Sequence, residues 1–300
     1  MIVVVVHWNQ PDRCARTIER FQHQGVAVRV VVVDNGSRPA ELERLRTVVR
    51  DGPFDVELIE LGVNAGFGPA ANAGFRRWLA EPDSGDWVAL APHDALPEDG
   101  GLRKLVDAAR ARPRAGLACA DVGDGQVPIV DPYFGGLTMP GEDRPGWQAV
   151  DYPHGTLLIA SRACMADIGL FDERYFAYCE EADLGLRARD AGWEVGLVRG
   201  AMVTNPTMRS GSPAVDYLMH RNTLLLVREH SGRYHACVRF SIAGCQLVRG
   251  VLQPSSRPPL FSAKGRARGM LDFARGRYGA PPAELFAEAG EPPVRSPAIV

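Results

Sequence analysis

The fold is decided by the stretch Val28-Arg29-Val30-Val31-Val32-Val33-Asp34-Asn35-Gly36-Ser37. Its β-branched run predicts a strand that is covered on both faces, as in a parallel sheet. The polar residues that follow would lie at the carboxyl edge of that sheet, where α/β proteins bind ligands. The Asp34 carboxylate could accept hydrogen bonds there from a ribose or a base N–H. The same residue types also suit a helix-capping turn, so this stretch alone leaves both interpretations open.

Strands and helices alternate through the first 120 residues. The expected strands are 2–6, 28–33, 56–61, 87–91 and 116–120, and the helices between them begin near Pro11, Pro39, Pro69 and Gly101. This order predicts an α/β fold with a mostly parallel, Rossmann-like sheet and helices on both faces. The first strand is followed by His7-Trp8-Asn9-Gln10-Pro11 rather than a GxGxxG signature, which argues against an NAD or FAD enzyme.

The pattern changes after residue 120. Residues 121–150 are rich in Gly and Pro and predict a loop with short antiparallel strands. A strand at 156–160, a helix at 180–191 and a strand at 194–198 complete a first domain, 1–211. A helical region, 212–280, follows, with helices that begin at Ser212-Pro213, near Tyr234 and near Ala263. Residues 281–300 are rich in Pro and Ala, and we expect a flexible tail.

Composition excludes several classes of protein. The 300 residues are 46% hydrophobic and 23% charged, with a net charge of −2, so the chain lacks the positive charge that a nucleic-acid partner requires. The six cysteines form no CxxC pair, which argues against a zinc site or disulfide framework and favours free thiols in a reducing cytosol. The N-terminus resembles a buried strand rather than a signal peptide, and no stretch has the apolar length of a membrane span. We therefore expect a cytoplasmic protein.

Two further loops are candidates for ligand contact. Asn64-Ala65-Gly66-Phe67-Gly68 precedes a helix whose positive end would face the same edge, and Gly66 would let backbone approach a ligand closely. Ala91-Pro92-His93-Asp94 closes the fourth strand, and the Asp94 carboxylate could ligate Mg²⁺ or Mn²⁺. Taken alone, the first is also an ordinary strand-to-helix loop and the second a capping aspartate.

The most informative stretch is Gly169-Leu170-Phe171-Asp172-Glu173-Arg174-Tyr175-Phe176-Ala177-Tyr178-Cys179-Glu180-Glu181-Ala182-Asp183-Leu184-Gly185-Leu186-Arg187. Its acids open a helix, where the helix dipole favours them, directly after a cluster of Phe and Tyr. Glu180 and Asp183 share one face, and Asp183 can pair with Arg187 four residues on. Glu181 points elsewhere. A carboxylate in partly apolar surroundings has a raised pKa, which is what a general base requires.

Together these stretches resemble the family 2 glycosyltransferases of the GT-A fold, especially the branch that includes bacterial rhamnosyltransferases. The family signature Gly-Gly-Phe-Asp-Glu-x-Phe-Phe-x-Tyr-x-Glu-Asp-x-Asp-Leu-x-x-Arg matches the stretch that ends at Arg187. The other matching pieces stand in family order and cover about residues 1–280: His7-Trp8-Asn9, 33–37, 64–68 with Asn72, Asp94, Arg221-Asn222 and 268–279.

The resemblance implies an inverting transfer of a sugar, by analogy a deoxysugar such as rhamnose, from a nucleoside diphosphate donor to an acceptor hydroxyl. Glu181 would be the general base, and a divalent cation, Mg²⁺ or Mn²⁺, would bind the diphosphate at Asp94. Glu180, Asp183 and Arg187 would hold their helix in register. The donor would contact His7, Asn9, Asp34, Asn35, Gly66, Asn72, His93 and Asp94.

Three departures from the family pattern concern this chemistry. Pro92 replaces the first metal donor, Glu181 replaces the usual Asp, and Thr204-Asn205-Pro206 replaces a His. Asn205 could still give the metal a carbonyl oxygen, and His93 could compensate. The departures keep two alternatives open: a non-catalytic relative that binds a nucleotide sugar, and a nucleotidyltransferase on a related scaffold.

The C-terminal helices are basic in character, with Arg249, Arg257, Lys264, Arg266, Arg268, Arg275 and Arg277. One interpretation is peripheral contact with the anionic inner face of a membrane. The other is that these helices pack on the catalytic domain or form a homodimer. The acceptor is expected to be a carbohydrate, a lipid-linked molecule or a small molecule.

Overall fold

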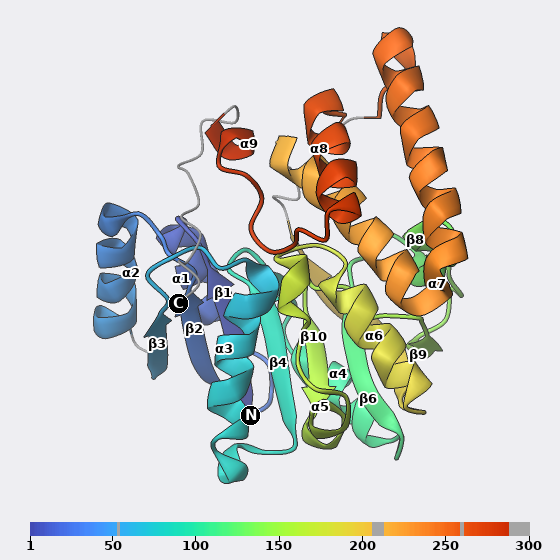
Figure 1. Cartoon of the computed structure of the whole chain (residues 1–300). Helices are drawn as coiled ribbons and strands as arrows, with labels where there is room; N and C mark the ends of the chain where they lie inside the picture. The colour runs from blue at the N-terminus through green and yellow to red at the C-terminus, as the bar shows by residue number, and fades with distance from the viewer. Residues whose placement is uncertain (53–54, 206–212, 259–260, 288–300) are drawn as a thin grey trace.

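The computed structural model describes residues 1–52, 55–205, 213–258 and 261–287. Within these residues a nine-stranded sheet has the order β3-β2-β1-β4-β10-β6-β11-β5, and β9 pairs with β11. Figure 1 shows it as the central layer. Its strands are β1 (Ile2–His7), β2 (Arg29–Asp34), β3 (Val56–Glu60), β4 (Trp87–Pro92), β5 (Leu96–Pro97), β6 (Ala115–Asp121), β9 (Gly146–Ala149), β10 (Leu158–Ser161) and β11 (Glu194–Thr204).

The sheet is mostly parallel, which confirms the prediction. β1 pairs in parallel with both β2 and β4, and β6 pairs in parallel with β11. β10 runs antiparallel between β4 and β6, while β5 and β9 run antiparallel to β11. In the register, His7 lies beside Asp34, and Val6 lies beside Pro92. The loops after β1, β2 and β4 therefore meet at one edge of the sheet.

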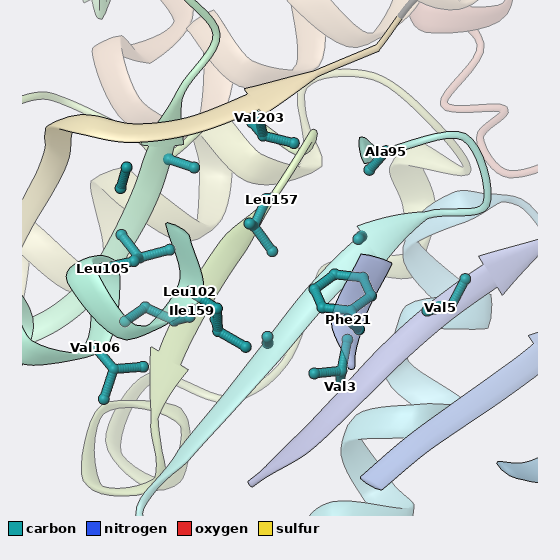
Figure 2. Close-up of a cluster of buried hydrophobic side chains, with 14 of the residues drawn as sticks. Val3, Val5, Phe21, Ala95, Leu102, Leu105, Val106, Leu157, Ile159 and Val203 are labelled. Atoms are coloured by element: carbon teal, nitrogen blue, oxygen red, sulfur yellow. The ribbon is translucent and has the colours of Figure 1, made fainter. Parts of the chain in front are cut away.

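Alternate residues of the valine runs pack into two separate hydrophobic cores, one on each face of the sheet. Val3 and Val5 pack on the side of α1 (Pro11–Phe21), α2 (Pro39–Asp51) and α4 (Gly101–Arg110), the cluster drawn in Figure 2. Val4 and Val6 pack on the side of α3 (Phe67–Leu79), α5 (Arg162–Ile168) and α6 (Glu180–Asp190). Covering both faces explains why these strands contain almost no polar residue.

The predicted antiparallel insertion is present. β7 (Gln126–Asp131) and β8 (Gly135–Pro140) form a hairpin beside the main sheet, and β9 adds to β11. The sequence did not predict the short strand β5 or the helix α5, which Ser161 caps by accepting a hydrogen bond from the Cys164 N–H. Short 3-10 turns lie at η1 (Pro82–Ser84), η2 (Glu173–Tyr175) and η3 (Pro254–Ser256).

The C-terminal helices follow the prediction in outline. α7 (Pro213–Leu252) is interrupted at Gly232, whose φ of 88° and ψ of 173° are not helical, so it consists of the two expected helices. α8 (Ala263–Ala274) packs against both of them. The predicted cap Ser212 lies outside the described residues. No helix within the described residues has the length and apolarity to cross a membrane.

The expected flexible tail is partly corrected. Residues 281–287 lie within the described part of the chain and include a short helix, α9 (Glu284–Ala287). Leu285 of this helix is buried against Phe176 and Tyr217, which are far away in the sequence. This contact supplies the apolar burial that the Pro- and Ala-rich composition did not suggest. The boundaries 1–211 and 212–280 stay a prediction.

Candidate active site

The edge where β1 and β2 end is built around a buried pair, His7 and Asp34. Their side chains have no exposed surface, and His7 Nδ1 lies 2.9 Å from Asp34 Oδ1. The Gln10 backbone N–H donates to His7 Nε2, so Nε2 is the acceptor and Nδ1 carries the proton. The Ser37 hydroxyl and the Ser37 backbone N–H also donate to the Asp34 carboxylate. Together these contacts lock the loops after β1 and β2 to each other.

These contacts also set the charge of Asp34. Burial alone would raise the pKa of this carboxyl, but the hydrogen bonds from His7 and Ser37 outweigh it and hold the pKa below its ordinary value. Asp34 is therefore ionised, and both of its oxygens are already hydrogen-bonded. Its side chain has no exposed surface and holds the edge of the sheet together, and its contact with a ribose or a base stays a prediction.

Asn9 and Asn35 are brought to this edge, as expected. Asn9 has a positive φ of 56°, and its Oδ1 accepts from the Arg38 N–H while its own N–H donates to Ser37 Oγ. Asn35 Nδ2 donates to Asn64 Oδ1, and Asn35 Oδ1 accepts from the Ala65 N–H. Asn9 therefore fastens the loop after β1 to the loop after β2, and Asn35 fastens the loop after β2 to the loop after β3.

Gly66 has a different reason for being glycine from the one we expected. Its φ is 103°, and a Cβ atom there would lie 2.3 Å from the backbone oxygen of Phe176. The Gly68 N–H donates to the same oxygen. Residues 64–68 thus approach the loop that precedes α6 rather than an open ligand site.

Asn72 does not join the edge residues. It is buried in α3, where its amide pairs with both the N–H and the carbonyl oxygen of Phe171. Its Nδ2 also lies 3.0 Å from Glu173 Oε1. Both amide N–H groups and the amide oxygen are thus engaged with the segment before α6, and the contact of Asn72 with the donor stays a prediction.

Asp94 and Asn205, the two predicted metal ligands, lie next to each other. β5 pairs with the end of β11, which brings Asn205 within 3.1 Å of Asp94 Oδ1 through its Nδ2 atom. His93 precedes Asp94, and its ring and that of His7 are arranged edge to face, with 5.5 Å between the ring centroids. Burial lowers the pKa of His93 to about 4, so its ring is neutral at neutral pH. Among the described residues, no group of three or more His, Cys, Asp or Glu could hold a metal by itself.

The loop before α6 is strained in a way that fixes the helix start. Phe176, Tyr178 and Cys179 all have positive φ, between 66° and 72°, which non-glycine residues rarely adopt. The fully buried side chains of Arg221 and Asn222, from α7, hold the carbonyl groups of this loop. Asn222 Nδ2 lies 2.8 Å from the oxygens of Tyr175, Ala177 and Tyr178. Backbone strain of this kind persists only where surrounding contacts impose it, and it is found most often at functional sites.

We expect Asn222→Ala to lower the free energy of unfolding by about 2 kcal/mol, since it leaves buried carbonyl groups without their donor. Chemical denaturation measures this loss. The matched control is Gln253→Ala, which truncates an exposed amide beyond the end of α7 and should change stability by less than about 0.5 kcal/mol. Equal losses in the two variants would show that Asn222 does not hold the loop.

Glu180 and Glu181 begin α6 and point in different directions. The Glu180 side chain lies against Gly68, and its Oε2 is buried without a hydrogen-bond partner among the described residues. Glu181 lies against Gly155, where a Cβ atom would stand 2.1 Å from Glu181 Oε1. Burial raises the pKa of Glu180 well above its ordinary value, and the charge of Glu181 raises it further. Burial raises the pKa of Glu181 to about 7.

Glu181, with a pKa near neutrality, can lose its proton and accept one from a neighbouring hydroxyl. Burial and the charge of Glu181 favour the protonated form of Glu180. The sequence predicted the raised pKa of Glu181 from the aromatic residues before it. It gave no sign that Gly155, 26 positions earlier, would form the surface on which this carboxylate rests.

Asp183 and Arg187 pair as predicted, at 2.8 Å. Arg187 also donates to the carbonyl oxygens of Ile168 and Leu170, which ties α6 to the segment after α5. A partner that the sequence did not reveal is His230 of α7, whose Nε2 lies 2.9 Å from Asp183 Oδ1. These contacts fix the orientation of α6 and hence of Glu181.

A model of the family described as Glycosyl transferase family 2 matches residues 2–154 of the chain. A curated relative from Mycobacterium tuberculosis is 30% identical over 281 aligned residues. It is the N-acetylglucosaminyl-diphospho-decaprenol L-rhamnosyltransferase, and the alignment covers 80% of this chain and 89% of the relative. The chain belongs to glycosyltransferase family 2. It resembles the rhamnosyltransferase branch in particular, and this assignment decides against the nucleotidyltransferase alternative.

Solved structures show that this family 2 glycosyltransferase has the GT-A fold. The mannosyltransferase PcManGT from Pyrobaculum calidifontis, in complex with GDP-Man and Mn²⁺, aligns with a TM-score of 0.56 at 15% identity. The alignment covers 91% of this chain and 85% of that one. GalNAc-T7 with UDP, GalNAc and Mn²⁺ aligns with a TM-score of 0.62 at 14% identity, covering 94% of this chain and 58% of that one.

Proposed function

We propose that this enzyme transfers rhamnose, with inversion, from a nucleoside diphosphate donor to a hydroxyl of a sugar that is linked to a lipid through a diphosphate. The acceptor class and the sugar are carried over from the relative of 30% identity. The observation that carries the catalytic part is the position of Glu181. It begins α6, rests on Gly155, and has a pKa raised to about 7 by burial.

The proposed reaction has one step. The acceptor oxygen attacks the anomeric carbon in line with the bond to the diphosphate, that bond breaks, and Glu181 takes the proton of the hydroxyl. A base of pKa near 7 is well matched to this transfer at neutral pH. Burial and the charge of Glu181 raise the pKa of Glu180, which favours its uncharged form and lowers the negative charge that the anionic diphosphate meets.

The residues at the end of β4 and β11 suit a divalent cation that is shared with the donor. Asp94 and Asn205 offer carboxylate and amide oxygens, the donors that Mg²⁺ and Mn²⁺ prefer. Two protein ligands are enough when phosphate oxygens and water complete the coordination shell. A bound cation would neutralise the charge that develops on the departing diphosphate.

Measurements of sugar transfer and of metal binding test this proposal. We expect a thermal-shift screen of nucleoside diphosphate sugars to select a rhamnose donor, and rhamnose transfer to a polyprenyl diphosphate N-acetylglucosamine to stop in EDTA. We expect Asp94→Ala to weaken Mn²⁺ binding, measured by calorimetry with a nucleoside diphosphate present, by at least ~10-fold.

The matched control for Asp94→Ala is Asp99→Ala, five residues further on, whose side chain is 71% exposed. This variant should bind Mn²⁺ as the unaltered protein does. Unchanged Mn²⁺ affinity in Asp94→Ala would remove Asp94 from the metal site. Donor binding without transfer in the presence of any divalent cation would contradict the catalytic proposal.

A further inference from the structure

Residues 230–271 carry an unusual charge pattern. They contain seven basic residues and no Asp or Glu, in a chain whose net charge is −2. Two of the basic groups are neutralised within the protein, since Arg266 pairs with Asp216 and Arg268 pairs with Asp272. Arg233, Arg249 and Arg257 are exposed, and no described carboxylate lies within ion-pair distance of them.

The second half of α7, residues 233–252, presents an uncovered and partly apolar face. Tyr234, Val248, Val251 and Leu252 have exposed fractions of 69%, 57%, 50% and 73%. Exposed positions recur every three or four residues and so share one face: Tyr234, Cys237, Ser241, Cys245, Val248 and Leu252. Large apolar side chains that are exposed together mark a surface that meets a partner.

The opposite face of the same helix is already used. Phe240 packs near Phe273 of α8, with ring centroids 6.4 Å apart, and Ala243 packs with Met270. Gly250 lies so close to Phe261 that a Cβ atom would clash with its ring. The contacts with α8 therefore turn the apolar stripe and its arginines outward, away from the protein.

The position of this surface suits an acceptor carried on a membrane. α7 begins after β11 and its buried Arg221 and Asn222 hold the loop that leads into Glu181. In Figure 1 the N-terminal end of β1 lies at the lower edge of the sheet, and its carboxyl end lies at the upper edge, where the candidate site is. α8 and the second half of α7 also lie toward this upper edge. The far half of α7 then extends outward beyond Gly232.

We propose that the exposed stripe of 233–252, with Arg233, Arg249 and Arg257, is a docking surface for an anionic lipid bilayer. The role of this surface in catalysis rests on the proposed lipid-linked acceptor, whereas the binding of the protein to the bilayer does not. The arginines would attract anionic headgroups, and the side chains of Tyr234, Val248, Val251 and Leu252 would enter the interface. A second copy of the chain fits less well, because a two-fold interface would place this acid-free, basic face against itself.

Co-sedimentation with vesicles tests the surface in the full-length protein. We expect binding to vesicles that mix phosphatidylglycerol with phosphatidylcholine, little binding to phosphatidylcholine alone, and release at high salt. Each basic residue near an anionic surface contributes about 1 kcal/mol, or ~5-fold, so Arg249→Ala with Arg257→Ala should lower the partition coefficient ~25-fold. Leu252→Asp should also lower it. The matched control is Arg50→Ala on α2, an arginine that is 65% exposed, and it should bind as the unaltered protein does.

The outcomes separate docking from catalysis, because the vesicles contain no acceptor. Equal binding to both kinds of vesicle, or no effect of the double arginine variant, overturns the proposal. A dimer in solution that Leu252→Asp dissociates, without vesicle binding, overturns it in favour of a second copy. Transfer to a water-soluble acceptor should be unchanged in the variants that fail to bind. Vesicle binding without transfer of any sugar would refute the proposed function and leave the docking surface standing.

Discussion

Replacing Glu181 by Gln is expected to lower kcat by ~10²–10⁴-fold and to leave donor affinity nearly unchanged. The substitution keeps the size of the side chain and removes only its ability to accept a proton. Burial raises the pKa of Glu181 to about 7, so kcat of the unaltered enzyme should fall about tenfold for each pH unit below 7 and level off above it. The residual rate of the Gln variant should lose this dependence. Steady-state kinetics across pH, with donor binding by calorimetry, measures both effects.

Glu180→Gln is the matched control for this experiment. Glu180 lies next to Glu181 but points toward α3, and burial and the charge of Glu181 raise its pKa, which favours the protonated form. Its replacement by an uncharged amide of the same shape should therefore cost much less in kcat and should keep the pH profile. If Glu181→Gln retains the unaltered kcat, or if Glu180→Gln abolishes the pH dependence, another group is the base.

Hydrophobic patterning was sufficient to predict the main sheet and its edge. The valine runs of β1 and β2 are buried on both faces, and this requirement shows directly as unbroken β-branched sequence. The pairing that places His7 beside Asp34 then follows from parallel neighbours. The antiparallel insertion of β10 between β4 and β6 could not be predicted, because it depends on long-range pairing that leaves no local periodicity.

The site shows the same division between local and long-range signals. Glu181, Asp183 and Arg187 could be placed because helix spacing and the aromatic residues before the helix are local features. The hydrogen-bond partners of Asp34 and Asn72 could not be predicted, because His7 and Phe171 lie far from them in the sequence. A polar residue near a strand end or a helix start indicates an edge, but only its hydrogen-bond partners show whether it faces a ligand.

Gly155 takes no part in the proposed proton transfer, yet we expect Gly155→Ala to lower kcat by about 10²-fold. The backbone angle of Gly155 does not require glycine, but the added methyl group would lie 2.1 Å from Glu181 Oε1. The clash is with the end of a flexible side chain, so the carboxylate can rotate away at little cost in stability. A displacement of about 1 Å is enough to remove a base from its hydroxyl. Thermal unfolding should therefore change little while kcat falls.

A double variant shows whether this loss acts through the carboxylate. Asp is one methylene shorter than Glu, so Glu181→Asp would withdraw the carboxylate from the added methyl group. We expect Glu181→Asp to be less harmful in the Gly155→Ala enzyme than in the unaltered one, a non-additivity that two independent sites would not show. Gly244→Ala, which adds a methyl group in α7 with only Met270 nearby, at 3.8 Å, should leave kcat unchanged. Strict additivity of the two losses would mean that Gly155 acts on something other than Glu181.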